Sequence, residues 1–507
     1  MGIVQQDAIK TSFISFAGIG LGYLNKAFLF VLLFSTTQVG LINLLMSVGL
    51  LFAQFSNLGT IYTTWRFFPF FRNTEKQHFG FLLANLLLVV LGSLFFSGLL
   101  LLLKPQVVAI YTEKSPLFVA YFSWIIPLGF ALVLFHLFEN YLRGMGRNVL
   151  PVFLQEIVLR VFTTFLLILF GLDLLSFHLF VACYVCLHFA PALYLLLYLI
   201  KHKELVFRFK SIQISKRFKR LILSYSGFSY LNSLANLLVI SMDALMIARY
   251  RGMAETGVYT TMLFLISALI FPYRSIMRVA TPLVAKQWKE RDMAGMQALY
   301  QKSSSVGLLL ALAGFLGVWI VIDPLLSFAP AYAGGKWVFF FLMLGRIIDM
   351  YFGLNGVIFS TSKKYKTDLV FTFLLIISVY LVNLWLIPLY GIIGAAISTS
   401  GAYLVYNLLR GGFIHYEYQL HPFKWVQVRL LLLGLLIFIG FWILDARIGS
   451  LFHLQPFVQI IVKELLLFVV FILPIFRWNL EPESVGYVQK IWKKFRKYHL
   501  KKVLSKI

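Results

Sequence analysis

The chain has 507 residues, of which 60% are hydrophobic, 17% aromatic and only 13% charged. A soluble globular protein carries about 25% charged residues, so this chain lacks the polar side chains that would cover a soluble surface of its size. The 45 lysine and arginine residues outnumber 19 aspartate and glutamate residues and give a formal charge of +26. The composition excludes an ordinary soluble enzyme and predicts an all-α polytopic membrane protein.

Fourteen apolar stretches are long enough to be transmembrane helices, because about 20 helical residues cross the hydrocarbon core of a bilayer. They cover approximately residues 11–34, 39–62, 79–103, 117–141, 149–170, 175–200, 221–247, 256–277, 303–325, 337–360, 368–387, 391–410, 427–445 and 455–476. The second stretch contains the polar residues Gln54 and Asn57, and the eleventh and twelfth meet at Tyr390 and Gly391.

The basic residues divide unequally between the two sides of this map. With a cytoplasmic N-terminus, most of them fall on cytoplasmic segments, as the positive-inside rule requires. The few on the opposite side are Lys104, Lys114, Arg249, Arg251, Lys336 and Arg447. We therefore expect both termini to be cytoplasmic. Because topology explains the basic charge, we expect no nucleic-acid partner.

The densest basic segment, residues 201–220, separates the sixth span from the seventh. We interpret it as a cytoplasmic linker between an N-terminal lobe of six helices (1–200) and a C-terminal lobe of six (221–411). Parallel halves of this kind are a transporter design. Two further helices follow in residues 412–477. The basic amphipathic tail, 478–507, predicts a helix that lies on the anionic cytoplasmic leaflet.

Charged residues inside the spans are the candidate functional residues, since each costs about 2.5–3.5 kcal/mol to insert and needs a partner or a polar cavity. The bases are Lys26, Arg160, Arg274, Arg346 and Lys463, and the acids are Glu156, Asp349 and Glu464. Three further acids, near helix ends, stand outside this set: Glu139, Asp243 and Asp323.

The spacing of these charges predicts their pairing. Glu156 and Arg160 are four residues apart, and Arg346 and Asp349 are three apart, so each pair shares one helical face. Lys463 and its neighbour Glu464 diverge by about 100° around a helix, which predicts separate partners.

Five bases against three acids predict a cavity that favours an anion. Lysine and arginine are the side chains that recognise phosphate, the charged group of a lipid-linked sugar. We assign substrate binding to the cations Lys26, Arg160, Arg274 and Arg346. We assign ion pairing or coupling in the cavity to Glu156, Asp349, Lys463 and Glu464. The alternative is that these charges only form ion pairs between helices or reach the membrane surface by snorkelling. For Arg274, which lies beside Pro272, snorkelling and substrate binding are equally favoured.

Motifs of soluble enzymes are incomplete in this chain. Gly334-Gly335-Lys336-Trp337 lacks the leading glycine and the final serine or threonine of a phosphate-binding loop. Cys183 and Cys186 form a C-x-x-C pattern inside a span without a second pair of ligands, which favours packed thiols over a metal site. We therefore expect a transporter with no catalytic residues, no metal and no cofactor.

Several short segments carry a family likeness. They are Glu139-Asn140-Tyr141-Leu142-Arg143 with Pro151, Ser241-Met242-Asp243-Ala244-Leu245-Met246-Ile247, Glu255-Thr256-Gly257-Val258-Tyr259, Pro272-Tyr273-Arg274 with Pro282, Gly356 to Lys363, and Pro388-Leu389-Tyr390-Gly391-Ile392-Ile393-Gly394-Ala395-Ala396. In these segments the chain resembles the oligosaccharide (polysaccharide) flippases of the multidrug/oligosaccharidyl-lipid/polysaccharide (MOP) exporter superfamily. The likeness extends over nearly the whole chain.

The resemblance implies twelve to fourteen helices in two lobes that alternate between inward-open and outward-open states. It implies transport of an undecaprenyl-diphosphate-linked oligosaccharide from the cytoplasmic to the periplasmic leaflet of a bacterial inner membrane, for surface polysaccharide or O-antigen lipopolysaccharide synthesis. The implied partners are that substrate, membrane lipids and other polysaccharide-assembly membrane proteins. Two alternatives share the fold, a multidrug exporter and a flippase of peptidoglycan precursor (lipid II). A membrane enzyme of the same pathway would need long outer loops, whereas the longest here has about a dozen residues.

Overall fold

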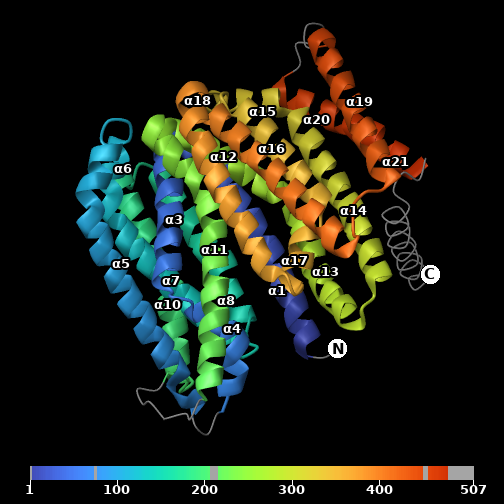
Figure 1. Ribbon diagram of the computed structural model, residues 1–507. Coiled ribbons are helices and arrows are strands. Elements are labelled where there is room, and N and C mark those ends of the chain that lie inside the picture. Colours follow the sequence, from blue (N-terminus) through green and yellow to red (C-terminus); the bar gives the residue numbers. More distant parts are fainter. Residues whose placement is uncertain (1–2, 74–76, 206–214, 449–454, 478–507) are drawn as a thin grey trace, which may run out of the picture. The chain divides into compact units, whose positions relative to one another are not determined.

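The computed structural model describes residues 3–73, 77–205, 215–448 and 455–477 (Figure 1). Within these ranges every regular element is a helix. Eleven helices are long and apolar enough to cross a membrane, or up to 13 when each of two bent helix pairs is counted as one span. The predicted all-α polytopic membrane fold is confirmed.

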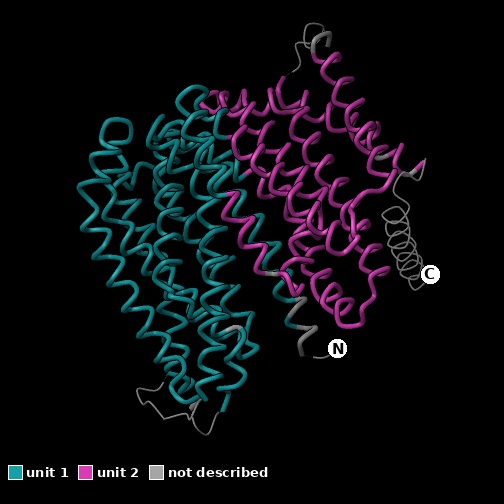
Figure 2. Tube along the Cα trace, viewed as in Figure 1, with its two compact units in different colours: residues 1–264, 376–395 teal, residues 265–375, 396–507 magenta. Residues whose placement is uncertain are grey.

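Two compact units divide the chain (Figure 2). Unit 1 comprises residues 1–264 and 376–395, and unit 2 comprises residues 265–375 and 396–507. The predicted division into two lobes of six helices stays a prediction. Residues 206–214 of the basic linker and the amphipathic tail, 478–507, lie outside the described residues.

Unit 1 is built on long apolar helices with many buried phenylalanines. Its helices are α1 (Ile3–Tyr23), α2 (Phe30–Leu33), α3 (Thr36–Ser56), α4 (Thr60–Phe71), α5 (Phe81–Tyr111), α6 (Pro116–Tyr121), α7 (Ile125–Gly144), α8 (Val149–Phe153), α9 (Leu159–Gly171), α10 (Phe177–Lys201), α11 (Lys216–Tyr250) and most of α12 (Met253–Leu269). Helix α7 packs against α3, α4 and α10. The outward leucines of α5, among them Leu94 and Leu102, are exposed, as side chains that face lipid should be.

Unit 2 holds the C-terminal helices. They are α13 (Phe271–Glu290), α14 (Met293–Trp319), α15 (Ile322–Ser327), α16 (Gly335–Phe352), α17 (Asn355–Thr361), both ends of α18 (Tyr365–Tyr418), α19 (Trp425–Ile448), α20 (Pro456–Leu467) and α21 (Leu473–Arg477). Helix α14 packs against α13, α16 and α19, and α15 packs against α20.

The second predicted span, 39–62, ends too late. Helix α3 stops at Ser56, because Asn57 folds back on the chain and Gly59 adopts a left-handed conformation (φ 83°). The Asn57 side chain accepts a hydrogen bond from the Gly59 N–H at 2.8 Å and donates one to the Gln54 carbonyl at 2.8 Å. The polar residues that interrupt this stretch in the sequence therefore mark the true end of the helix.

Three other breaks fall within or between predicted spans: two lie inside the predicted spans 256–277 and 337–360, and the third lies at the predicted boundary between 368–387 and 391–410. Helices α12 and α13 form a pair bent by 51°, with Pro272 in the first turn of α13, so the predicted span 256–277 is not straight. Helices α16 and α17 are bent by 53° near Gly353. Helix α18 has 54 residues, more than twice the about 20 that a span needs, and Gly391 interrupts it with φ 58° and ψ −137°. The predicted spans 368–387 and 391–410 lie on either side of this break.

Candidate functional site

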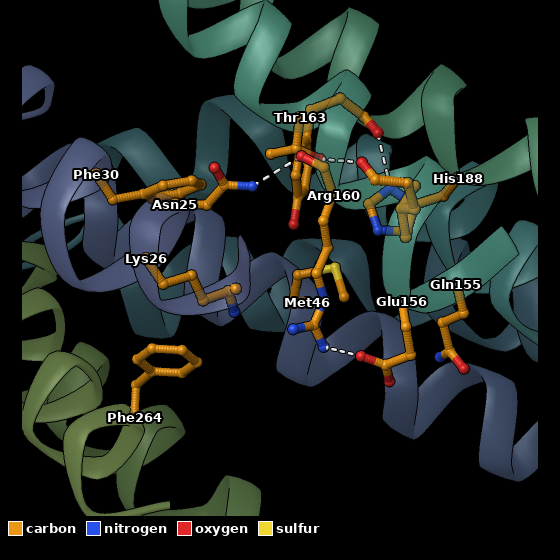
Figure 3. Close-up of a pocket in the computed structure, with 13 residues that line it drawn as sticks. Asn25, Lys26, Phe30, Met46, Gln155, Glu156, Arg160, Thr163, His188 and Phe264 are labelled. Carbon is orange, nitrogen blue, oxygen red and sulfur yellow. Dashed lines mark hydrogen bonds and ion pairs between the residues drawn. The ribbon is translucent and has the colours of Figure 1, made fainter. Parts of the chain in front are cut away.

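A pocket of about 230 Å³ lies inside unit 1, between the first span and the α8–α9 segment (Figure 3). Its lining includes three of the charged residues expected in a substrate cavity, Lys26, Glu156 and Arg160. Polar and aromatic side chains complete the wall: Asn25, Gln155, Thr163, Tyr184, His188, Phe30 and Phe264.

Two π-helical turns supply the charged walls of this pocket. The turn η1 (Leu24–Leu29) carries Lys26, and the turn η4 (Leu154–Val158) carries Glu156. Such turns are rare and are frequently found at functional sites. The local backbone therefore favours a functional role for this pair of turns.

Asn25 joins the two walls. Its side-chain NH₂ donates to the Arg160 carbonyl at 2.9 Å, and its side-chain oxygen accepts from the Thr164 hydroxyl at 2.7 Å. The residue is only 3% exposed. Because Asn25 is buried, these two bonds fix the first span against α9 and hold the neighbouring Lys26 at the pocket.

Lys26 points into the pocket toward the Arg160 guanidinium (Figure 3). Its ammonium lies 5.5 Å from the centroid of the Phe264 ring. No ion pair joins Lys26 to an acid in the described part of the chain. A lysine inside a span without an acid partner faces water, binds an anion or loses its proton, and a charged Lys26 gives the pocket an unmatched positive charge.

Arg160 forms the predicted ion pair with Glu156, at 2.6 Å between Nη2 and Oε2. Its guanidinium also donates to the Gly18 carbonyl. A Cβ at Gly18 would lie 2.7 Å from the Glu156 Cβ, and one at Gly22 would overlap the Arg160 guanidinium. The two glycines therefore provide the room for the ion pair.

The predicted site residues of unit 2 form a second group. Arg346 and Asp349 on α16 are paired at 3.7 Å, and the Arg346 guanidinium lies 4.9 Å from the centroid of the Tyr403 ring. The Asn407 side chain donates to Asp349 at 3.4 Å. Arg274 is exposed on α13 and interacts electrostatically with both Arg346 and Asp349. The four proposed substrate cations thus fall into two pairs, one in each unit.

Lys463 and Glu464 take separate directions on α20, as predicted. The Lys463 ammonium pairs with Asp445 of α19 at 2.5 Å, while Glu464 is exposed. Neither lines the pocket of unit 1.

Comparison with known proteins identifies the fold. No family model and no curated protein matches the sequence. Among solved structures, the lipid II flippase MurJ in an inward closed conformation matches with a TM-score of 0.69 at 14% identity, over 94% of this chain and 99% of that one. An inward-facing multidrug resistance transporter of the MATE family and MOP superfamily matches with a TM-score of 0.57 at 13% identity, over 83% and 95%. This chain has the fold that MurJ shares with the MATE transporters.

A third match in the MOP fold is a transporter from Pyrococcus furiosus, described as having a binding pocket of reverse polarity that suggests a different function. Its TM-score is 0.52 at 13% identity, over 82% of this chain and 96% of that one. At such identities the likeness is one of fold.

The fold also brings together charges that the sequence pattern does not reveal. Asp368 and Arg410, at opposite ends of α18, are paired at 2.6 Å between Oδ1 and Nη2, and each is 8% exposed. The Arg410 guanidinium lies 4.6 Å from the centroid of the Tyr406 ring. Each residue lies at the end of a predicted span, where a charge can reach water and is not by itself a candidate functional residue. Only the fold-back of α18 reveals their proximity.

Asp243, which the predicted spans place near a helix end, is buried in unit 1. It accepts hydrogen bonds from the Tyr259 hydroxyl at 2.5 Å and from the Asn383 side chain at 2.8 Å. Asn383 lies in the middle of a predicted span. A polar side chain at such a position indicates a buried polar partner, and this was the sequence feature that could have revealed the contact with Asp243.

Proposed function

We propose that this protein is a MOP-fold flippase that moves an undecaprenyl-diphosphate-linked oligosaccharide across a bacterial inner membrane, from the cytoplasmic to the periplasmic leaflet. The observation that carries the proposal is Lys26, a lysine in the wall of an intramembrane pocket, directed at a second cation and without an acid partner in the described residues.

The charge of the pocket selects the class of substrate. Lys26, Arg160 and Glu156 together carry a net positive charge, which attracts a phosphate and repels a cationic drug. Phosphate oxygens accept charge-assisted hydrogen bonds from both lysine and arginine, and arginine binds them with two parallel bonds. This argues for a lipid phosphate over the multidrug-exporter alternative.

Glu156 gives the pocket a way to hold and release its ligand. In the empty pocket the carboxylate occupies the Arg160 guanidinium, which limits the cost of a buried charge. An arriving diphosphate binds Lys26 and competes with Glu156 for Arg160. When the transporter opens to the other side, Glu156 pairs with Arg160 again and the lipid dissociates. Alternating access then requires only that the two open states differ in their affinity for the phosphate.

A lipid II flippase is the second candidate. The MurJ match covers 94% of this chain, more than the 83% of the MATE match, and lipid II also carries its charge on a diphosphate. The pocket cations suit both substrates equally. The two candidates differ in the group that the diphosphate carries.

Lipid-linked glycan analysis of a strain that lacks this protein tests the proposal. We expect an undecaprenyl-diphosphate oligosaccharide to accumulate on the cytoplasmic side and surface polysaccharide to fall. Accumulation of lipid II would favour the second candidate. If no lipid-linked glycan accumulates, the flippase proposal is wrong, and raised sensitivity to cationic drugs would then support an exporter.

Variants of Lys26 link this phenotype to the pocket. Lys26→Gln removes the charge but keeps a polar side chain, and we expect transport to fall about tenfold or more at normal protein level. That loss equals about 1.4 kcal/mol of binding free energy. Lys26→Arg keeps the charge and should retain partial transport. Lys10→Gln, at an exposed lysine near the start of the same span, is the matched control and should transport like the parent. If Lys26→Gln also transports like the parent, Lys26 is not a substrate cation.

A further inference from the structure

A second pocket, of about 240 Å³, lies in unit 2 where α14 and α19 end and α16 begins. Two tryptophans, Trp319 and Trp442, line it together with two aspartates, Asp323 and Asp445, and with Lys336. The charge map of the sequence places Lys336 on the side of the membrane opposite the cytoplasm. On this predicted map, the pocket lies on the side to which the proposed flippase delivers its substrate.

The charges of this pocket are balanced. The Lys336 ammonium lies 2.7 Å from each carboxylate oxygen of Asp323 and 5.4 Å from the centroid of the Trp319 ring. Asp445 is paired with Lys463 at 2.5 Å. Two acids and two bases leave no net charge, so the pocket does not select an ion. Each carboxylate still has free lone pairs that can accept hydrogen bonds from hydroxyl groups.

One tryptophan of the pocket is packed against another ring, and the other tryptophan is exposed. Trp319 stacks on Phe438, with ring centroids 6.0 Å apart and an interplanar angle of 25°. Trp442 is 70% exposed at the edge of the pocket. A concave site with flat aromatic walls and a few convergent polar groups is typical of small-molecule recognition.

We propose that this pocket binds a sugar ring of the transported glycan on the outer side of the membrane. Aromatic faces pack against the apolar faces of a pyranose, and Asp323, Asp445 and Lys336 are placed for its hydroxyls. The volume is below the about 300–1,000 Å³ typical of drug-sized ligands, which suits one ring. The inference rests on the proposed function and adds a second contact, to the neutral part of the same substrate. The competing explanation is an aromatic belt at the membrane surface, which needs neither a pocket nor carboxylates.

Saturation-transfer NMR on the full-length protein in lipid nanodiscs, free of sugar-based detergent, tests this inference. The probes are methyl β-D-glucopyranoside, methyl β-D-galactopyranoside and N-acetylglucosamine. We expect transfer to at least one probe, and a loss of at least fivefold in the variant Trp442→Ala. Trp425→Ala is the matched control, since Trp425 lies at the other end of α19 and is 72% exposed. It should leave the signal unchanged.

Two outcomes overturn the inference: no transfer to any of the three probes in the parent protein, or equal transfer in Trp442→Ala and Trp425→Ala, as an aromatic belt predicts. Binding of inorganic diphosphate, measured on the same samples, separates this inference from the proposed function. If diphosphate binds the parent and not Lys26→Gln while no sugar binds, only the sugar site is wrong. If sugar binding depends on Trp442 while Lys26→Gln has no effect on diphosphate, the sugar site stands and the phosphate assignment falls.

Discussion

Two arginines of this protein form ion pairs of the same chemistry in different surroundings. Arg160 in unit 1 and Arg410 in unit 2 each lie 2.6 Å from a carboxylate, Glu156 and Asp368 respectively. The side chains of the first pair are 29% and 24% exposed and line a pocket with a further lysine. Those of the second are 9% and 12% exposed, and aromatic rings cover the guanidinium.

The two ion pairs differ in whether a third charged group, such as a phosphate, has access to the arginine. Under the proposed function, a phosphate reaches Arg160 and replaces its carboxylate partner, because Arg160 lines a pocket that also holds Lys26. The pair of Asp368 and Arg410 is closed, so neither partner can change without leaving a buried charge alone. We therefore interpret an accessible ion pair beside an additional cation as a candidate binding site. We interpret an enclosed ion pair as a structural clasp, that is, a pair that only stabilises the fold.

Removing one partner of the closed pair should have the largest effect on stability. In Arg410→Met the Asp368 carboxylate loses its counter-charge in a buried site, and we expect destabilisation by about 3–5 kcal/mol. The double variant Asp368→Asn with Arg410→Met removes both charges and should recover much of this loss. Thermal unfolding of purified protein measures both.

Arg251→Met is the matched control, because Arg251 pairs with Glu255 at 3.0 Å in an exposed setting. It should cost less than about 1 kcal/mol. A single Arg410→Met variant as stable as this control would show that the buried pair is not a clasp.

Local spacing in the sequence is enough to predict part of the site. Four residues between Glu156 and Arg160 place both on one helical face, and the structure pairs them. A lysine in the middle of a span, Lys26, lies at a pocket wall. These features depend on one helix at a time, so helical periodicity reveals them.

Contacts between distant segments could not be predicted in this way. Asp368 meets Arg410 only because α18 folds back at Gly391, and the partner of Asn25 is a carbonyl 135 residues away. The π-helical turns that carry Lys26 and Glu156 have no sequence signature, since they depend on the packing of one span on another. The bends and breaks, by contrast, fall at prolines, glycines and an asparagine that the sequence displays.

The wall of the open pocket offers a test of intermediate size. Asn25→Ala removes the two hydrogen bonds that join the first span to α9, and we expect a loss of about 1–2 kcal/mol in stability together with weaker transport. A double-mutant cycle with Thr164→Val should give a coupling of about 1 kcal/mol. Asn236→Ala is the control, since Asn236 is exposed and bonds only within its own helix. Additive effects of Asn25→Ala and Thr164→Val would contradict the role assigned to Asn25.

The smallest effect on stability should come from Arg346 and Asp349, whose charged atoms are 3.7 Å apart and whose side chains are 25% and 34% exposed. A long, accessible ion pair contributes about 0–1 kcal/mol, so Arg346→Ala, Asp349→Asn and the double variant should all fold with nearly the parental melting temperature. If Arg346 binds the substrate phosphate, the two variants that lack it should lose transport and Asp349→Asn should retain some. The pair would then resemble the Arg160 site in function although it lies in the other unit. Should the double variant instead be more stable and more active than Arg346→Ala, the pair is a clasp like that of Arg410, and the substrate cations are confined to unit 1.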